Sequence, residues 1–370
     1  MKDIFMAGSS IQQNGMKQTK GTLVLEDGYK MEGYVFGYPK SAAGEVVFNT
    51  GMVGYPETLT DPSYKGQILV FSYPLIGNYG VPKGEMISGL LQGFESDRVQ
   101  IQALIVSQHS HHYSHCLASK GLDEWLREHE VPALSGIDTR MLTKRLRENG
   151  SMLGKIEMEN EPLGFYDPNV DNLASMVSVE RPIRYPKGGK TVVLIDCGAK
   201  SSIIRNLLDR NLSVLRVPWN YDFLQEKFDG VVVSNGPGDP KSCPDTISHI
   251  RKVMDRRVPV FGVCLGHQIM ALAAGADTYK LKFGHRSQNQ PCVEVKTRRC
   301  YITSQNHGYA VRIESLPPAW EPWFVNANDG TNEGIRHRSL PFMSVQFHPE
   351  AQPGPVDTAH LFDRFTALLS

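Results

Sequence analysis

The 370-residue sequence has no apolar run long enough to cross a membrane, and residues 1–20 lack the uninterrupted apolar segment of a secretory signal. It also has no long block of like charge, because 39 Lys and Arg residues balance 39 Asp and Glu residues. These absences argue against a membrane protein and against a nucleic-acid groove. We therefore expect a cytoplasmic protein whose ligand is a small molecule or another protein.

Cysteine is scarce and never occurs in a CxxC motif. The six cysteines are Cys116, Cys197, Cys243, Cys264, Cys292 and Cys300. In a chain of this length, such scatter argues against a disulfide framework and against a zinc knuckle. A cysteine with a special role must therefore be recognised from its local context.

Length and periodicity predict two domains, because 370 residues exceed what one core usually organises. Residues 1–20 are polar and are expected to form a flexible extension. Residues 21–155 combine a hairpin signal at Asp27-Gly28 with further strand-like runs and two helical patterns, at 121–130 and 138–150. Proline, glycine and charge replace this pattern over 156–189, which we expect to be a linker before a second domain at 190–370.

In the second domain, short β-branched runs alternate with helix-length segments. The strand-like runs are residues 191–196, 212–218, 229–235 and 258–263. Fully apolar strands that alternate with helices predict a parallel sheet covered on both faces, an α/β domain. Ligands bind at the carboxyl ends of the strands in such sheets, and Cys264 directly follows the last of these runs.

Cys264 stands between two glycines in the segment GVCLG, residues 262–266. This is the G-x-nucleophile-x-G spacing of a nucleophile elbow, in which small neighbours let a strained residue project its side chain. A helix after the turn would point its N-terminal amides and positive dipole end at the sulfur. The alternative is that Cys264 is a small buried apolar residue, as most free cysteines are. The spacing alone does not decide between the two.

A candidate base and its orienting acid occur near the C-terminus, in SVQFHPEAQPGP. His348 and Glu350 are two residues apart, so they face the same side of an extended segment. With Cys264 they would complete a triad, in which His348 accepts the thiol proton and Glu350 orients the imidazole. Taken alone, an H-P-E segment is more often a surface turn.

A third segment, SNGPGDP at 234–240, follows the strand-like run 229–235. Its glycines suit a backbone that turns amides inward, as an oxyanion hole requires. It lacks the Lys and Ser/Thr of a phosphate-binding P-loop. The segment is therefore informative mainly because it follows a strand-like run of the second domain.

Together these motifs resemble the class I, or triad, glutamine amidotransferases, whose signature is a G-x-C-x-G-H-Q elbow with a distant H-P-E. Segments 44–80, 136–150 and 304–311 are further similar to the small, glutamine-hydrolysing subunit of carbamoyl phosphate synthetase. The match covers roughly residues 21–368. The resemblance implies an α/β protein with an N-terminal three-layer β/β/α domain and a C-terminal flavodoxin-like amidotransferase domain with a mostly parallel sheet.

The resemblance also implies a reaction. In the family, the elbow cysteine, here Cys264, attacks the side-chain amide of glutamine to give a glutamyl thioester and ammonia, and water then releases glutamate. The amides of Gly236 and Leu265 are expected to stabilise the oxyanion. The expected substrate-binding residues are Ser63, which would reach in from the other domain, and Gly236, Gly238, Leu265, Gln268, Asn306, Gly308 and Tyr309.

The family further implies a partner, because its ammonia passes through a tunnel to a large subunit that makes carbamoyl phosphate for pyrimidine or arginine biosynthesis. We expect a heterodimer in which ATP, Mg²⁺ and bicarbonate are used by the large subunit, with no cofactor or metal on this chain. Two alternatives stay open: a stand-alone cysteine γ-glutamyl hydrolase and a catalytically silent scaffold. The intact triad argues against the scaffold, and the N-terminal domain argues against the stand-alone hydrolase.

Some residues depart from the family pattern or offer other chemistry. Many relatives have asparagine at Ser202, glycine at Ser287 and phenylalanine at Tyr309, which affects loop or tunnel detail rather than the triad. The segment HSHHYSHC, residues 109–116, offers histidine and thiolate ligands for a metal. Because the family assigns no metal to this segment, we expect a solvated loop there.

Overall fold

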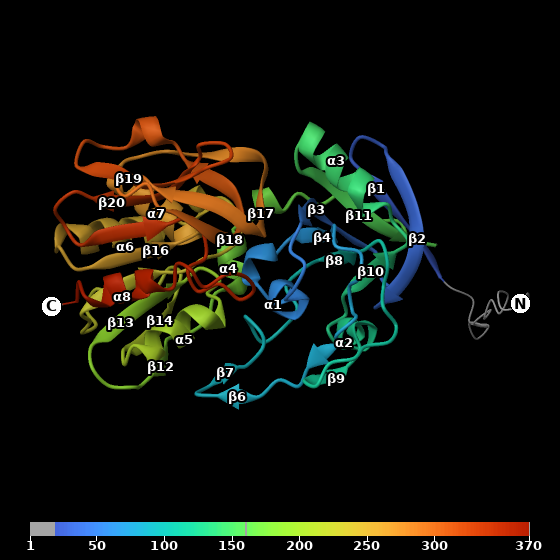
Figure 1. The fold of residues 1–370 in the computed structure, drawn as a ribbon, viewed down its shortest axis with the longest axis horizontal. Helices are drawn as coiled ribbons and strands as arrows, with labels where there is room; N and C mark the ends of the chain where they lie inside the picture. Colours follow the sequence, from blue (N-terminus) through green and yellow to red (C-terminus); the bar gives the residue numbers. More distant parts are fainter. Residues whose placement is uncertain (1–18, 160, 370) are drawn as a thin grey trace, which may run out of the picture.

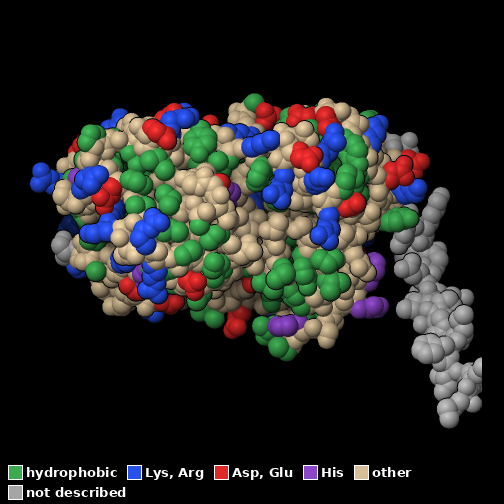
Figure 2. All heavy atoms as spheres, turned by 45° about the horizontal axis from the view of Figure 1, so that its top comes forward, with side chains coloured by type: hydrophobic (Ala, Val, Ile, Leu, Met, Phe, Trp, Pro, Cys, Tyr) green, Lys and Arg blue, Asp and Glu red, His purple; other side chains and the backbone are tan. Residues whose placement is uncertain are grey.

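The computed structural model describes residues 19–159 and 161–369. Figure 1 shows two bodies side by side, the N-terminal one in blue and green and the C-terminal one in yellow to red. Acidic and basic side chains are interspersed on the face drawn in Figure 2. In the described ranges, no helix is both long enough and apolar enough for a membrane span. Residues 1–18 of the expected extension lie outside the described residues, and the first strand already begins at Lys20.

The N-terminal strands form a closed barrel in the order β1-β11-β3-β4-β8-β10-β2. The hairpin predicted at Asp27-Gly28 is present, because β1 and β2 pair antiparallel. The two β layers that the family resemblance implies are thus joined to each other at both edges, so that the strands form one closed barrel. The barrel strands are β1 (Lys20–Leu25), β2 (Lys30–Gly37), β3 (Ala42–Asn49), β4 (Gln67–Phe71), β8 (Ala103–Ile105), β10 (Pro132–Ser135) and β11 (Met152–Met158).

Both helices predicted for this half are present and pack on different sides of the barrel wall. Leu142 and Leu146 of α3 contact the core enclosed by the strands, and α3 ends at Gly150, whose φ of 105° favours glycine. Trp125 and Leu126 of α2 pack on the outer face. The elements outside the barrel are α1 (Tyr55–Leu59), η1 (Pro62–Tyr64), β5 (Val81–Pro82), β6 (Met86–Ile87), β7 (Leu90–Leu91), β9 (Ala118–Lys120), α2 (Leu122–Glu128) and α3 (Thr139–Asn149).

The C-terminal half contains a sheet with the strand order β12-β14-β13-β15-β16-β21-β20-β19-β17-β18. Strands β14, β13, β15, β16 and β21 run parallel, as predicted, whereas β20, β19, β17 and β18 extend the sheet antiparallel. Short turns within this extension allow only antiparallel pairing. The strands are β13 (Thr191–Asp196), β14 (Ser213–Pro218), β15 (Gly230–Val233), β16 (Val260–Val263), β17 (Thr278–Glu294), β18 (Cys300–Val311), β19 (Trp320–Asn326), β20 (Asn332–His337) and β21 (Phe342–Val345).

Helices cover both faces of the parallel strands, which confirms the predicted flavodoxin-like α/β architecture. Val192 and Leu194 of β13 face a core shared with α5 (Ser201–Asp209) and α8 (His360–Thr366). Val193 and Ile195 face the opposite core, shared with α6 (Pro244–Asp255) and α7 (Leu265–Ala274). Apolar residues therefore fill both sides of each central strand, which is why their sequences show no alternation.

The segment 156–189, expected to be a linker, contains regular structure of its own. It holds η2 (Pro168–Val170), α4 (Leu173–Val177) and β12 (Ile183–Tyr185). The other short elements of the C-terminal half, outside this segment, are η3 (Pro240–Ser242) and η4 (Ile313–Ser315). Strand β12 pairs with β14 at the edge of the large sheet. The end of the expected linker is therefore part of that sheet.

Candidate active site

Three of the segments singled out in the sequence follow neighbouring parallel strands. The SNGPGDP loop follows β15, Cys264 follows β16, and the His348 segment follows β21, and these strands are adjacent in the sheet. Because carboxyl ends of parallel strands meet at one edge, the fold itself brings the segments together. This edge faces the N-terminal body (Figure 1).

Cys264 has the geometry of a nucleophile elbow. It caps α7 with φ 54° and ψ −104°, a strained conformation for a residue with a side chain. Its N–H donates to the Val345 carbonyl at 2.9 Å, which anchors the turn to β21. A Cβ on Gly262 would lie 2.6 Å from the Gly266 carbonyl oxygen, and one on Gly266 would collide with the Val233 carbonyl. The flanking glycines are therefore required by close backbone contacts.

His348 and Glu350 lie behind the thiol in the order that a triad requires. His348 Nδ1 is 2.6 Å from Glu350 Oε1, and His348 Nε2 has no hydrogen-bond partner in the described chain. Burial lowers the pKa of His348, but the negative charges of Glu350 and Cys264 outweigh it and raise that pKa to about 10. In its protonated form His348 stabilises negative charge on the adjacent sulfur.

Two side chains at the triad were not found from the sequence. Lys200 is 3% exposed, and its Nζ lies 3.1 Å from Glu350 Oε1 and donates to the Ala351 carbonyl at 2.5 Å. Burial raises the pKa of Glu350, but Lys200 and His348 lower it to about 2. Gln346 directs its Nε2 at the sulfur of Cys264, at 3.7 Å. The one signal for Lys200 is its position just after β13, at the same edge of the sheet.

The residues expected to bind substrate line a single cavity with Cys264. Its empty volume is about 580 Å³, part of which is open to solvent. In the described chain, the N–H groups of Gly236 and Leu265 have no hydrogen-bond acceptor, so both are available to an oxyanion. The expected residues in this lining are Ser63, Gly236, Gly238, Leu265, Gln268, Asn306, Gly308 and Tyr309.

The N-terminal body contributes one wall of this cavity. Asn235 Nδ2 donates to Ser63 Oγ at 2.8 Å, which places Ser63 at the cavity as expected. Asn306 Nδ2 donates to Asp61 Oδ2 at 3.1 Å, so the segment at η1 is tied to two segments of the C-terminal half. The completeness of the cavity therefore depends on how the two bodies are held together.

Arg286 is a further cavity residue that the sequence analysis did not assign. It is 5% exposed, its Nη1 donates to the Phe283 carbonyl at 2.7 Å, and its Nε has no partner in the described chain. Burial lowers the pKa of its guanidinium, and the charge of Glu45 opposes this. A buried guanidinium with a free N–H is suited to a carboxylate ligand.

The three departures from the family pattern lie around the triad but not within it. Ser202 Oγ donates to Glu95 Oε2 at 2.5 Å, so Ser202 joins α5 to the N-terminal body. Ser287 is buried and its hydroxyl has no partner among the described residues. Tyr309 accepts from Gln268 Nε2 at 2.9 Å through its backbone carbonyl, a contact that any residue there can make.

The histidine-rich segment 109–116 is only partly the solvated loop that was expected. His111, His112 and His115 are exposed, but His109 is buried and stacks on Phe36 with ring centroids 4.2 Å apart. Burial lowers the pKa of His109 to about 4. Its imidazole therefore acts as an apolar packing group against the barrel.

Known families match both halves of the chain. Residues 23–156 match the carbamoyl-phosphate synthase small chain, CPSase domain, and residues 193–368 match the glutamine amidotransferase class-I family. Mitochondrial carbamoyl-phosphate synthase (ammonia) of Homo sapiens is 50% identical over 96% of this chain and 24% of its own length. Multifunctional protein URA2 of Saccharomyces cerevisiae is 49% identical over 93% of this chain and 17% of its own length. Multifunctional protein CAD of Squalus acanthias is 50% identical over 93% of this chain and 16% of its own length.

The chain thus spans a quarter or less of the length of these relatives. Both family matches agree with the resemblance inferred from the sequence motifs. The chain belongs to the carbamoyl-phosphate synthase small chains, with a class-I glutamine amidotransferase domain as its C-terminal half.

Proposed function

We propose that this chain hydrolyses L-glutamine to glutamate and ammonia and delivers the ammonia to carbamoyl phosphate synthesis. The observation that carries the proposal is the strained Cys264 at the N-terminus of α7, with His348 and Glu350 next to it and two backbone N–H groups free beside it. A buried nucleophile, a charged imidazole and an oxyanion site are what cleavage of a carboxamide needs.

The proposed reaction has two steps. The Cys264 sulfur attacks the side-chain carbonyl carbon of glutamine, while the N–H groups of Gly236 and Leu265 donate hydrogen bonds to the developing oxyanion. His348 then donates its proton to the leaving nitrogen, so that ammonia departs and a glutamyl thioester remains. In the second step His348 takes a proton from water, which attacks the thioester, and glutamate leaves as the sulfur is regenerated.

The cavity also supports recognition of the amino-acid end of glutamine. We assign the α-carboxylate to Arg286, because its guanidinium lines the same cavity and retains an unpartnered N–H. The side chains and amides of the expected substrate-binding residues would hold the remainder of the molecule. These are Ser63, Gly238, Gln268, Asn306, Gly308 and Tyr309.

We further propose that ATP, Mg²⁺ and bicarbonate are bound and used by a large synthetase unit and not by this chain. That unit can be a separate subunit, in a heterodimer, or part of one long polypeptide, as the length of the relatives suggests. The carbamoyl phosphate would feed pyrimidine or arginine biosynthesis. The cytoplasm stays the predicted compartment, although the relative from Homo sapiens is named as mitochondrial.

The first prediction tests the coupling to the large unit. Ser63 of the N-terminal body lines the cavity, and Asp61 of the same body accepts from the cavity residue Asn306, so a partner that repositions this body should control glutamine turnover. We expect glutamine hydrolysis to be about 10-fold or more faster in the complex with ATP and bicarbonate than in the isolated chain. Steady-state glutamate release, with Cys264→Ser as the background control, measures this ratio. An isolated chain as active as the complex would instead favour the stand-alone γ-glutamyl hydrolase.

The second prediction concerns the thiol itself. A glutamine-shaped chloroketone should alkylate Cys264 before any other cysteine, because the cavity positions the reagent and His348 stabilises the thiolate. Burial raises the pKa of Cys292 well above its usual range, so this thiol should stay unmodified. Peptide mass spectrometry gives the order of labelling, with iodoacetamide as a reagent that should favour the exposed Cys116 and Cys300. Equal chloroketone labelling of an exposed cysteine contradicts the assignment.

A further inference from the structure

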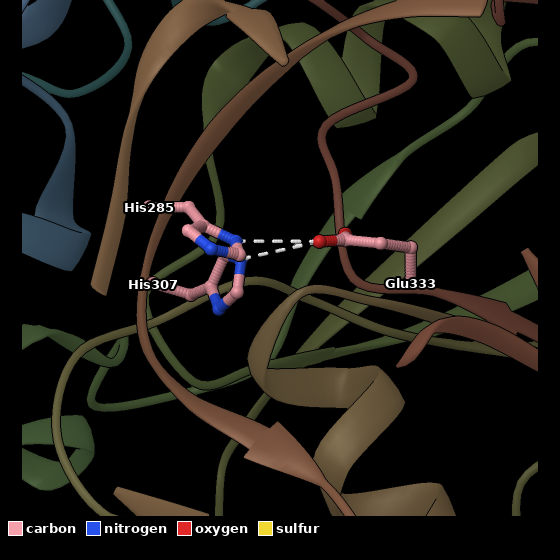
Figure 3. A group of neighbouring side chains, drawn as sticks. All are labelled: His285, His307 and Glu333. Atoms are coloured by element: carbon pink, nitrogen blue, oxygen red, sulfur yellow. Dashed lines mark ion pairs between the residues drawn. The ribbon is translucent and has the colours of Figure 1, made fainter. Parts of the chain in front are cut away.

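A second cluster of ionisable side chains lies next to the glutamine cavity. His285 of β17, His307 of β18 and Glu333 of β20 each direct one ligand-type atom to a common centre, and these atoms all lie within 4.8 Å of one another (Figure 3). His285 and His307 are direct partners in the β17–β18 register. All three side chains are buried, and the proposed glutamine reaction uses none of them.

The outer nitrogen of each imidazole is held by an acceptor. His285 Nε2 lies 2.8 Å from Asp329 Oδ2, and His307 Nδ1 lies 2.8 Å from the Tyr309 carbonyl oxygen. In the tautomer that carries the proton on the outer nitrogen, His285 Nδ1 and His307 Nε2 are lone-pair donors. Carboxylate or carbonyl partners on the outer nitrogen are typical of metal-binding histidines.

The centre of the cluster has an excess of acceptors. His285 Nδ1 is 3.3 Å and His307 Nε2 4.0 Å from Glu333 Oε1, and His307 Nε2 is also 3.1 Å from Gln305 Oε1. Glu333 is fully buried, and its Oε2 and His285 Nδ1 have no hydrogen-bond partner in the described chain. Asn326 Nδ2 and Thr331 Oγ1 donate to Glu333 Oε1 from outside the cluster, at 3.3 and 3.5 Å. Between the two histidines and Glu333 Oε2 no donor of the described chain is placed, and a cation there removes the cost of such buried acceptors.

We propose that His285, His307 and Glu333 form a binding site for one zinc ion, with the Gln305 amide oxygen placed as a fourth ligand. Ligand atoms about 2.0–2.2 Å from a tetrahedral zinc ion lie about 3.3–3.6 Å from one another. The separation of His285 Nδ1 from Glu333 Oε1 already lies in this range. His307 Nε2, now 4.0 Å from Glu333 Oε1, must approach it by about 0.4–0.7 Å. The two histidine nitrogens, which lie within 4.8 Å of each other, must also close to this range, so side-chain rotations would accompany binding.

Such a site is structural, because four protein ligands leave no open position for chemistry. Its effect falls on the glutamine cavity, since His307 stands between the cavity residues Asn306 and Gly308. A proton is the competing cation: burial lowers the pKa of His285, but Asp329 and Glu333 raise it to about 9. The centre therefore attracts positive charge, and the experiment must distinguish a metal ion from a proton.

Zinc titration of the full chain, stripped of metal with a chelator, tests the site. We expect one bound zinc per chain by elemental analysis after gel filtration, and a loss of affinity of about 10- to 100-fold in Glu333→Gln and His285→Asn. The matched control is His112→Asn in the exposed histidine-rich segment, which should bind like the unmodified chain. Absence of bound zinc, or a loss confined to His112→Asn, overturns the proposal and leaves the proton as the occupant.

Cobalt substitution gives a second readout that needs no variant. Co²⁺ bound by nitrogen and oxygen ligands in a tetrahedral site should give visible d–d bands without a thiolate charge-transfer band in the near ultraviolet. A thiolate band would place the ion on a cysteine and would overturn the assignment. Because metal stoichiometry and spectra are independent of glutamine turnover, this result does not depend on the proposed enzymatic function.

Discussion

Replacing Cys264 by Ser is expected to abolish glutamine-dependent carbamoyl phosphate formation and to leave ammonia-dependent formation near the unmodified rate. The serine keeps the shape of the elbow, but its hydroxyl is far harder to ionise, and loss of a triad nucleophile costs about three to six orders of magnitude in rate. Added ammonia enters after the thioester and so bypasses the lost step. Carbamoyl phosphate production with glutamine and with ammonium chloride, measured side by side on the complex, gives both rates.

Two further variants calibrate this result. His348→Asn should behave like Cys264→Ser, because it removes the proton donor for the leaving nitrogen. Glu350→Gln should be milder, because Glu350 orients His348 and touches no reacting atom. If Cys264→Ser abolished both activities in a complex that stayed assembled, this chain would take part in the synthetic steps and the proposed division of labour would be wrong.

Lys200→Met is expected to have the second largest effect, although Lys200 contacts no substrate. Its ammonium is buried against Glu350, and burial lowers its pKa while Glu350, Glu95 and Asp61 raise it. Removing one partner of a buried ion pair leaves an uncompensated charge and costs about 3–5 kcal/mol. We therefore expect both a lower melting temperature and a lower kcat, measured by thermal unfolding and by glutamate release.

The pH dependence distinguishes this effect from simple destabilisation. The surroundings of Glu350 depress its pKa to about 2. Its carboxylate therefore stabilises the fold at pH values above the ordinary glutamate pKa of about 4.3, and this stabilisation is lost as the pH falls toward 2. Without Lys200 that pKa rises, so the acid limbs of activity and of stability should both move to higher pH. Lys200→Arg, which keeps the positive charge, should leave the acid limbs close to their position in the unmodified chain. A Lys200→Met profile with an unmoved acid limb contradicts the assigned role.

Local signals indicated the parts of the proposed triad, and the family resemblance indicated that they act together. A β-branched run, a glycine on each side of Cys264 and a helical pattern specify a strand-to-helix turn, and the i, i+2 spacing places His348 with Glu350. Lys200, Gln346 and Arg286 were not predictable in this way. Lys200 and Gln346 contact residues far along the chain, and Arg286 lines a cavity that distant segments form together, and neither spacing nor periodicity reports such arrangements.

The fold shows the same division between local and long-range information. The parallel strands of the second sheet were predicted because they are uniformly apolar, and α2 and α3 because their apolar residues recur at helical spacing. Closure of the barrel requires β2 to pair with β10, about a hundred residues apart, which no local pattern encodes. Strand β12 forms the edge of the large sheet, but it is short and two of its residues, Ile183 and Arg184, are exposed. Its sequence therefore does not differ from that of a linker.

The central claim is that glutamine becomes covalently attached to Cys264 during turnover. Rapid acid quenching of the complex with isotopically labelled glutamine, followed by peptide mass spectrometry, tests it most directly. The account predicts a glutamyl thioester on the peptide that contains Cys264, at up to one label per chain, released by hydroxylamine and absent in Cys264→Ser. Glutamine turnover at the full rate with the label absent, or attached to any other residue, would contradict the account.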